Sequence, residues 1–482
     1  MNASFLVLVF IGYTLLIFGV TWITSRHANN DTYFIGNRRS PWFVVAYGMI
    51  GASLSGVTFM SVPGNVQAQN FFYMPMVFGF LAGYIIIATV LMPLYYRMKL
   101  TSIYTYLEKR FGRFTYRSGA AFFILSRTLG ATLRMFLVVS VLHVFILRDF
   151  GVPFWVAGLI FIILILLYTF EGGIKTIVWT DMLQTTFMLL AVIFSVVYIC
   201  KDMGWNLGDM LSAVKDSGKM QMFNTDWAAN THFLKQFLSG MFVCIAMTGL
   251  DQEMMQKNLS CRNLRAAKKN MFTFSGILVV VDFLFLLLGA VLVIYSQQKG
   301  LIFADTDLIF PTVAINHLGN VAGIIFIIGL ISAAYPSADG ALTSLTTSFC
   351  IDMLDMERRE QWAERKKKRI RYLVHFSFAA LFLLLVIFYN TVKNDAVINL
   401  VYAVASYTYG PLLGFFCFGI ITKYQVRDGA MPFVAVLSPV LCFVLDWAFT
   451  RYLHFGFGFT LLIVNGLLTF TGMMLFRRRR VS

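Results

Sequence analysis

The chain has 482 residues, of which 59% are hydrophobic and only 13% are charged, and it carries a net charge of +16. Soluble domains contain about a quarter charged residues, so this composition excludes a soluble protein and indicates a polytopic membrane protein. The basic residues lie in short runs between apolar segments, which argues against nucleic-acid binding, and the six cysteines lack metal-site spacing.

About 20 apolar residues cross a bilayer as a helix, and thirteen segments of the chain reach that length. The predicted spans are 4–24, 42–68, 71–95, 117–147, 152–171, 177–200, 231–256, 272–296, 309–351, 370–391, 395–422, 430–449 and 455–476. The first lacks a basic segment before it and a cleavage site after it, so we interpret it as a retained helix rather than a signal peptide.

The connections between the predicted spans alternate in charge. The basic connections are 26–39, 97–117, 257–269, 358–371, 423–427 and 477–480. Lys and Arg stay on the cytoplasmic side of a membrane. Thirteen crossings with this alternation predict an N-terminus outside and a C-terminus in the cytoplasm.

The second span contains residues that disrupt a transmembrane helix. Its segment 51–64 (GASLSGVTFMSVPG) holds three glycines, a proline and several hydroxyls. Backbone groups freed in lipid find no water, so such breaks persist only where they line a cavity. Unwound carbonyls and hydroxyls there hold cations or polar solutes, and the segment therefore predicts a transporter with its central site at this break.

A second polar interruption is predicted in the ninth span, at 331–342 (ISAAYPSADGAL). Pro336 removes a backbone donor and frees the carbonyl of Ser332, while Ser337 adds a hydroxyl and Asp339 a carboxylate. Hard oxygens of this kind suit an alkali cation. Taken alone the segment fits a simple proline kink, but together with the broken second span it favours an ion site.

Three of the charged residues within predicted spans are further candidates for a functional role. Asp181 near the start of the sixth span fits either a helix-start acid favoured by the macrodipole or a functional carboxylate. Arg127 and Arg134 share one face of the fourth span. Arg127 can reach the cytoplasmic interface, whereas Arg134 lies deeper and needs an anion or a watery cavity. Its guanidinium is shaped to bind a carboxylate through two hydrogen bonds.

The chain resembles the sodium/solute symporter family over nearly its whole length. The matching stretches are 99–111 (KLTSIYTYLEKRF), 168–184 (YTFEGGIKTIVWTDMLQ), 249–260 (GLDQEMMQKNLS), 332–342 (SAAYPSADGAL) and 409–413 (YGPLL). The resemblance implies an all-α LeuT-type fold of two inverted five-helix repeats, at 42–200 and 231–422. An extra helix at 4–24 and two more within 430–476 complete the single transporter domain.

Within this family the broken span looks most like that of the bacterial sialic-acid symporters, which share the pattern Leu-Ser-x-x-Thr-Phe-Met-Ser-x-Pro. Carried over by position, the resemblance implies a main sodium site made by the carbonyls of Gly51, Leu54 and Ala333 and the hydroxyl of Ser337. The family usually has a hydroxyl at the position of Pro336, so one ligand is missing here.

The same resemblance implies a second ion site and a substrate site. Asp181 matches an aspartate of the second sodium site, whose two serines fall on Asp339 and Gly340, so either a second sodium or a proton shared by the carboxylates is expected. The implied substrate contacts are Ser55, Thr58, Tyr73, Arg134 and, as a fallback, Arg127.

These observations predict a sodium-driven symporter, not an enzyme, that acts as a monomer and imports a small polar anionic solute such as sialic acid or a related acidic sugar. A neutral sugar, a monocarboxylate or an amino acid is the alternative solute. A membrane sensor that kept the fold and lost transport is the alternative of another class. The oxygens retained at Gly51, Leu54, Ala333 and Ser337 argue against that sensor.

Overall fold

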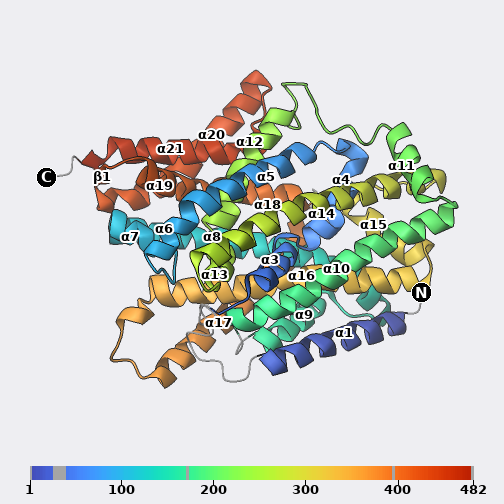
Figure 1. The fold of residues 1–482 in the computed structure, drawn as a ribbon, viewed down its shortest axis with the longest axis horizontal. Coiled ribbons are helices and arrows are strands. Elements are labelled where there is room, and N and C mark those ends of the chain that lie inside the picture. The colour runs from blue at the N-terminus through green and yellow to red at the C-terminus, as the bar shows by residue number, and fades with distance from the viewer. Residues whose placement is uncertain (1–2, 25–38, 170–172, 393–396, 479–482) are drawn as a thin grey trace.

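The computed structural model describes residues 3–24, 39–169, 173–392 and 397–478, which form a bundle of helices (Figure 1). The α-helices are α1 (Ala3–Thr24), α3 (Trp42–Ser53), α4 (Gly56–Gln69), α5 (Met74–Ile86), α6 (Met92–Arg97), α7 (Thr105–Arg110), α8 (Arg113–Leu142), α9 (Phe154–Thr169), α10 (Gly173–Met203), α11 (Leu207–Asp216), α12 (Phe233–Cys244), α13 (Gln252–Leu259), α14 (Leu264–Gln298), α15 (Ile309–Thr312), α16 (Asn320–Ser348), α17 (Glu364–Val392), α18 (Val397–Thr408), α19 (Gly410–Ile421), α20 (Met431–Leu453) and α21 (Leu461–Leu475).

The apolar segments predicted from the sequence are helical in the structure. Within the described residues, eight helices are long and apolar enough to cross a membrane, and three bent helix pairs raise the number to eleven. Two shorter apolar helices, Val7–Ile23 and Phe154–Leu167, match the two remaining predicted spans. The basic connection at 25–38, part of the motif at 168–184, the connection at 393–396 and the last four residues lie outside the described part of the chain.

One predicted span has different bounds in the structure. The segment 309–351 was predicted as one span, but the helical segment that begins with α15 ends at His317 and α16 starts only at Asn320. Gly319 between them has φ +84°, a left-handed conformation that glycine adopts without steric cost. From Asn320 the helix continues without a break through Pro336.

Helix α16 forms the centre of the bundle. Every residue from Gly329 to Ser348 is buried, and the helix packs against α3, α4, α8, α10 and α17. A helix that is apolar all round is a core helix. The helices at the two ends of the chain, α1 and the pair α20–α21, lie on opposite sides of the bundle (Figure 1). The segment after α21 returns to the bundle through a short antiparallel pair, β1 (Gln425–Val426) with β2 (Arg477–Arg478).

Helices α5 and α12 pack with their backbones in close contact because glycines face each other. A Cβ atom at Gly240 of α12 would collide with the carbonyl of Met76, and one at Gly79 of α5 would collide with the carbonyl of Phe237. Small residues let membrane helices approach in this way, and packing then stabilises their association. This pair holds the first half of one bent span, α12, against α5.

We predict that Gly240→Ala lowers stability by about 1–3 kcal/mol, because overpacking a tight contact forces the backbones apart. The matched control is Gly276→Ala on α14, where no atom lies within 4 Å of the added Cβ. Thermal unfolding of the purified protein checks this. Equal melting temperatures for both variants would contradict the close α5–α12 packing.

Candidate functional site

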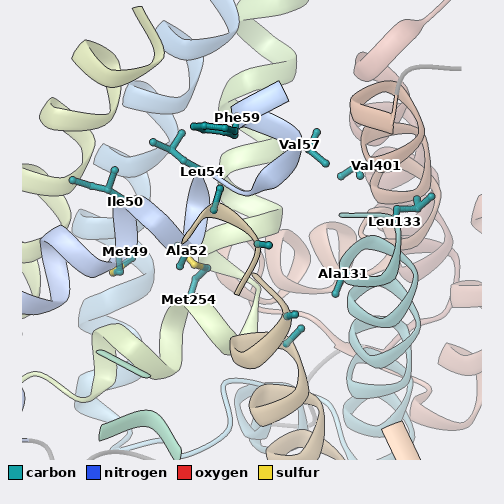
Figure 2. Close-up of a cluster of buried hydrophobic side chains, with 14 of the residues drawn as sticks. Met49, Ile50, Ala52, Leu54, Val57, Phe59, Ala131, Leu133, Met254 and Val401 are labelled. Atoms are coloured by element: carbon teal, nitrogen blue, oxygen red, sulfur yellow. The ribbon is translucent and has the colours of Figure 1, made fainter. Parts of the chain in front are cut away.

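A cavity of about 100 Å³ lies beside the break between α3 and α4. These two helices meet at Leu54 and Ser55 with a bend of 56°. Apolar side chains from α3, α4, α8, α13 and α18 surround this part of the molecule (Figure 2). The structure brings all five predicted substrate contacts to the cavity wall, namely Ser55, Thr58, Tyr73, Arg127 and Arg134. Their role in binding a solute stays a prediction.

The break between α3 and α4 leaves backbone oxygens without donors. No described residue donates a hydrogen bond to the carbonyl oxygens of Gly51 and Leu54. The position of the segment is nevertheless fixed, because the N–H of Gly51 donates to Oγ1 of Thr185 at 3.0 Å. A Cβ atom at Gly51 would collide with that hydroxyl, so glycine is needed for the close approach of α3 to α10.

A second bent span joins α12 to α13 with a bend of 64°. Here distant tyrosines supply the missing donors: the hydroxyl of Tyr95 donates to the carbonyl of Gly249 at 2.9 Å, and that of Tyr104 to the carbonyl of Leu250 at 2.9 Å. Asp251 caps α13 by accepting from the N–H groups of Glu253 and Met254. The protein therefore satisfies this break by itself.

The third bent span joins α18 to α19 with a bend of 48°. The side-chain amide of Asn465 on α21 donates to the carbonyls of Ser406 and Tyr407 at 3.0 and 2.9 Å. Buried backbone groups at membrane depth require such partners. The second and third breaks thus have donors from the protein, whereas the carbonyls of Gly51 and Leu54 at the first break do not.

The two α16 residues predicted for the main sodium site are both buried. Ala333 and Ser337 lie on a helix that packs against α3 and α4, and the Ser337 hydroxyl donates to the carbonyl of Ala334 at 3.0 Å. The expected interruption around Pro336 is not a break, since α16 runs from Asn320 to Ser348. The helix stays continuous among its packed neighbours, although Pro336 still offers no donor to the carbonyl of Ser332.

Asp181 of α10 is the first member of a chain of buried ion pairs. Its carboxylate lies 2.7 Å from Nζ of Lys257, which also lies 3.3 Å from Oε1 of Glu253. Glu253 in turn binds the guanidinium of Arg127, whose Nη1 lies 3.8 Å from Asp251. All five side chains are at most 5% exposed, so each charge relies on its neighbours for stabilisation.

This chain of ion pairs extends to the positions expected to form a second ion site. Asp181 pairs with the ammonium of Lys257, and a Cβ atom at Gly340 would collide with the Glu253 carboxylate. Asp339 is fully buried on α16 beside that glycine. A second bound ion at Asp181 and Asp339 stays a prediction, with Lys257 as its competitor for Asp181.

The two predicted arginines of α8 have different surroundings. Arg127 is 4% exposed and is paired with Glu253 and Asp251. Arg134 lines the cavity, and no described residue forms a hydrogen bond or ion pair with it. A guanidinium in such a place needs an anion or water. Of the two arginines, Arg134 is therefore the one whose donors are available to a solute.

Several residues of the site were not predicted from the sequence. Lys257 and Glu253 are four positions apart on α13, a spacing that places an acid and a base on one helix face, and this was the available signal. Asp251 sits in the motif at 249–260 and was given no role. Asp282 on α14 also lines the cavity, and the available signal was a lone acid inside the predicted apolar span 272–296.

Broken membrane helices around a small polar cavity are the architecture of a secondary transporter. The family model described as "Sodium:solute symporter family" matches residues 33–436 of this chain. The chain therefore belongs to the sodium:solute symporter family, and it is a sodium-coupled transporter rather than an enzyme.

Individual relatives agree with this assignment. The sodium/sialic acid symporter NanT of Aliivibrio fischeri is 24% identical over 452 residues, covering 92% of this chain and 88% of its own. The sodium/sialic acid symporter SiaT of Proteus mirabilis is 22% identical over 440 residues, covering 89% and 87%. A solved substrate-bound outward-open Na⁺-coupled sialic acid symporter superposes with a TM-score of 0.84 at 20% identity, covering 98% and 97%. The LeuT-type helical fold expected from the resemblance is confirmed.

We predict that Lys257→Met lowers the free energy of unfolding by about 3–5 kcal/mol, because it leaves the buried Asp181 carboxylate without its cation. The control is Lys299→Met, which removes a 3.0 Å ion pair with Asp202 whose side chains are 43% and 38% exposed. That change should lower stability by less than about 1 kcal/mol. Thermal unfolding with and without the second change Asp181→Asn measures the coupling, and additive effects would contradict a direct ion pair.

Proposed function

We propose that the protein imports a small solute bearing a carboxylate and that Arg134 binds this group. The observation that carries the proposal is the position of Arg134 on the cavity wall, without a hydrogen-bond or ion-pair partner among the described residues. The neighbouring Ser55 and Thr58 place hydroxyl groups on the same wall. A planar guanidinium with two free donor edges matches a carboxylate in a bidentate pair.

We place the sodium ion at the break between α3 and α4. The supporting observation is that the carbonyls of Gly51 and Leu54 accept no hydrogen bond from the described residues, while the other two breaks have protein donors. The carbonyl of Ala333 and the hydroxyl of Ser337 on the adjoining α16 would complete the set. Oxygen ligands of this kind, without a carboxylate, suit a monovalent cation.

One sodium ion per solute is the stoichiometry that the ion pairs favour. The ammonium of Lys257 already neutralises Asp181 at 2.7 Å, so a second cation there would have to displace it. Two positive charges beside one carboxylate repel each other strongly at low dielectric. The ammonium of Lys257 would also compete with the proton that was expected to be shared by Asp181 and Asp339.

Transport would follow alternating access, with the N-terminus outside and the C-terminus in the cytoplasm of a bacterial inner membrane. Sodium bound between α3, α4 and α16 would favour the outward-open state, and its release into the sodium-poor cytoplasm would complete the cycle. At a membrane potential of about 100 mV, each inward sodium charge contributes roughly 2.3 kcal/mol. The concentration gradient adds to this.

The names of the bacterial relatives support sialic acid or a related acidic sugar as the solute. The cavity supports a smaller one, because it measures about 100 Å³. A cavity of about 150 Å³ holds a benzene molecule, and a nine-carbon sugar acid is several times larger than benzene. A small monocarboxylate or amino acid is therefore closer in size to this cavity than a nine-carbon sugar acid, and the carboxylate is common to these solutes.

We predict that Ser337→Ala raises the sodium concentration for half-maximal uptake at least tenfold, because the hydroxyl is the only side-chain oxygen of the proposed site. Ser344→Ala is the matched control, since its hydroxyl also donates to a carbonyl of α16, that of Ala341 at 3.0 Å. Uptake into proteoliposomes against sodium concentration checks this. An unchanged half-saturating concentration in Ser337→Ala would remove Ser337 from the sodium site.

We predict that Arg134→Lys lowers the affinity for a transported carboxylate at least tenfold, because an ammonium cannot reproduce two parallel hydrogen bonds. Competition uptake with acidic sugars, monocarboxylates, amino acids and neutral sugars is the measurement. In Arg127→Lys the main effect should fall on stability, because Arg127 is held by Glu253 and Asp251. Good uptake of a neutral sugar with no response to carboxylates, or a silent Arg134→Lys, would show that Arg134 is structural.

A further inference from the structure

Asp282 of α14 is a buried acid that the proposed function does not use. It lines the same cavity as Arg134 and is only 2% exposed. No described residue forms a hydrogen bond or ion pair with its carboxylate. A carboxylate at membrane depth is costly without a partner and marks a functional site by default.

The other acids near the breaks have partners, which sets Asp282 apart. Asp181 and Glu253 contact Lys257, and Asp251 accepts from the hydroxyl of Tyr409 at 2.6 Å. Three charged residues line the cavity in the described structure: Arg127, Arg134 and Asp282. Arg127 is bound to Glu253 and Asp251. The cavity wall is therefore left with one cation, Arg134, and one anion, Asp282, that have no hydrogen-bond or ion-pair partner in the described part of the chain.

Arg134 and Asp282 belong to two different helices beside the broken span. Arg134 is carried by α8 and Asp282 by α14, and both helices pack against α4. Both residues line the cavity, and the described structure shows no ion pair between them. Two tyrosines that also line it, Tyr73 and Tyr402, have hydroxyl oxygens 3.0 Å apart. The wall thus presents a cation, a hydroxyl pair and an anion.

We infer that the solute is a small zwitterion of the amino-acid class, with its carboxylate at Arg134 and its ammonium at Asp282. This inference rests on the proposed role of Arg134 and adds the second pole of the solute. Each pole replaces water at a wall charge by a charge-assisted hydrogen bond. A solute without the ammonium leaves the Asp282 carboxylate desolvated and unpaired, so the site rejects it.

The size of the cavity favours a small member of this class over a larger solute. Its volume of about 100 Å³ is below the roughly 150 Å³ that encloses benzene. An amino acid with a short side chain has about as many non-hydrogen atoms as benzene. The zwitterion carries no net charge, so the charge moved in each cycle would be that of the sodium ion alone.

The test uses purified full-length protein in sodium buffer and three matched probes: L-alanine, L-lactate, in which a hydroxyl replaces the amine, and N-acetyl-L-alanine, in which the amine is neutral. A wider panel of free amino acids and their N-acetyl derivatives covers other side chains. Binding is measured by thermal stabilisation and by competition. We expect at least one free amino acid to bind at least tenfold more tightly than its hydroxy and N-acetyl counterparts.

The variant Asp282→Asn should lose at least tenfold in affinity for that amino acid and reduce its advantage over the hydroxy acid. Asp446→Asn is the matched control, because Asp446 is an acid of α20 that accepts from Tyr407 at 3.4 Å away from the cavity wall. It should bind like the wild type. The comparison of probes on the wild type stands by itself if Asp282→Asn fails to fold.

The test distinguishes a failure of the zwitterion inference from a failure of the proposed function, and it also detects a proton-carrying role of Asp282. If lactate, N-acetylalanine or sialic acid binds as well as any free amino acid and Asp282→Asn leaves this binding unchanged, the zwitterion inference is wrong while the role of Arg134 survives. If no carboxylate binds and only neutral sugars do, the proposed function itself is wrong. If uptake in Asp282→Asn loses an accompanying proton flux present in the wild type, Asp282 is a proton carrier, and the inference falls.

Discussion

The need to satisfy backbone groups at membrane depth shapes the centre of this protein. Each of three spans is bent by more than 40° at a break, and every break frees carbonyls that lipid cannot solvate. Tyrosine hydroxyls reach the break before α13, and the Asn465 amide reaches the break before α19. At the break between α3 and α4 no described residue donates to the carbonyl oxygens of Gly51 and Leu54. This difference between the three breaks is the reason why we propose the sodium ion at the first one.

Buried charges near the cavity also have partners within the protein. The protein buries Asp181, Lys257, Glu253, Arg127 and Asp251 next to one another, so that each charge has an opposite neighbour. Such a chain of ion pairs adds little net stability over apolar packing, but breaking it is costly. It ties α8, α10 and α13 together next to the cavity. Arg134 and Asp282, by contrast, line the cavity without a hydrogen-bond or ion-pair partner among the described residues, and we propose that their charges select the solute.

The sequence alone predicted the helices, the family and the first break, because these depend on local features. Glycine, proline and hydroxyls inside an apolar segment identified 51–64 without any knowledge of the tertiary structure. The cavity also gathered the predicted residues Ser55, Thr58, Tyr73, Arg127 and Arg134. These positions, carried over by resemblance to the family, line one cavity although the identity to the two bacterial relatives is only 22–24%.

What the sequence did not predict depends on partners far along the chain. Asp181 and Lys257 are 76 positions apart, so their ion pair could not be inferred from either neighbourhood. Pro336 looked like a break, but the packing of α16 on all sides keeps that helix continuous. Conversely, the break before α13 contains no proline, and it is stable because Tyr95 and Tyr104 lie beside it.

Hydrogen–deuterium exchange of the protein in sodium and in choline buffer tests the central claim most directly. Local opening frees amides to exchange, and a ligand bound to the closed form slows it. We expect sodium to slow exchange across 51–58 while leaving 249–254 and 406–411 almost unchanged, because the protein already satisfies those two breaks. Equal protection of all three breaks, or none at the first, would contradict the account.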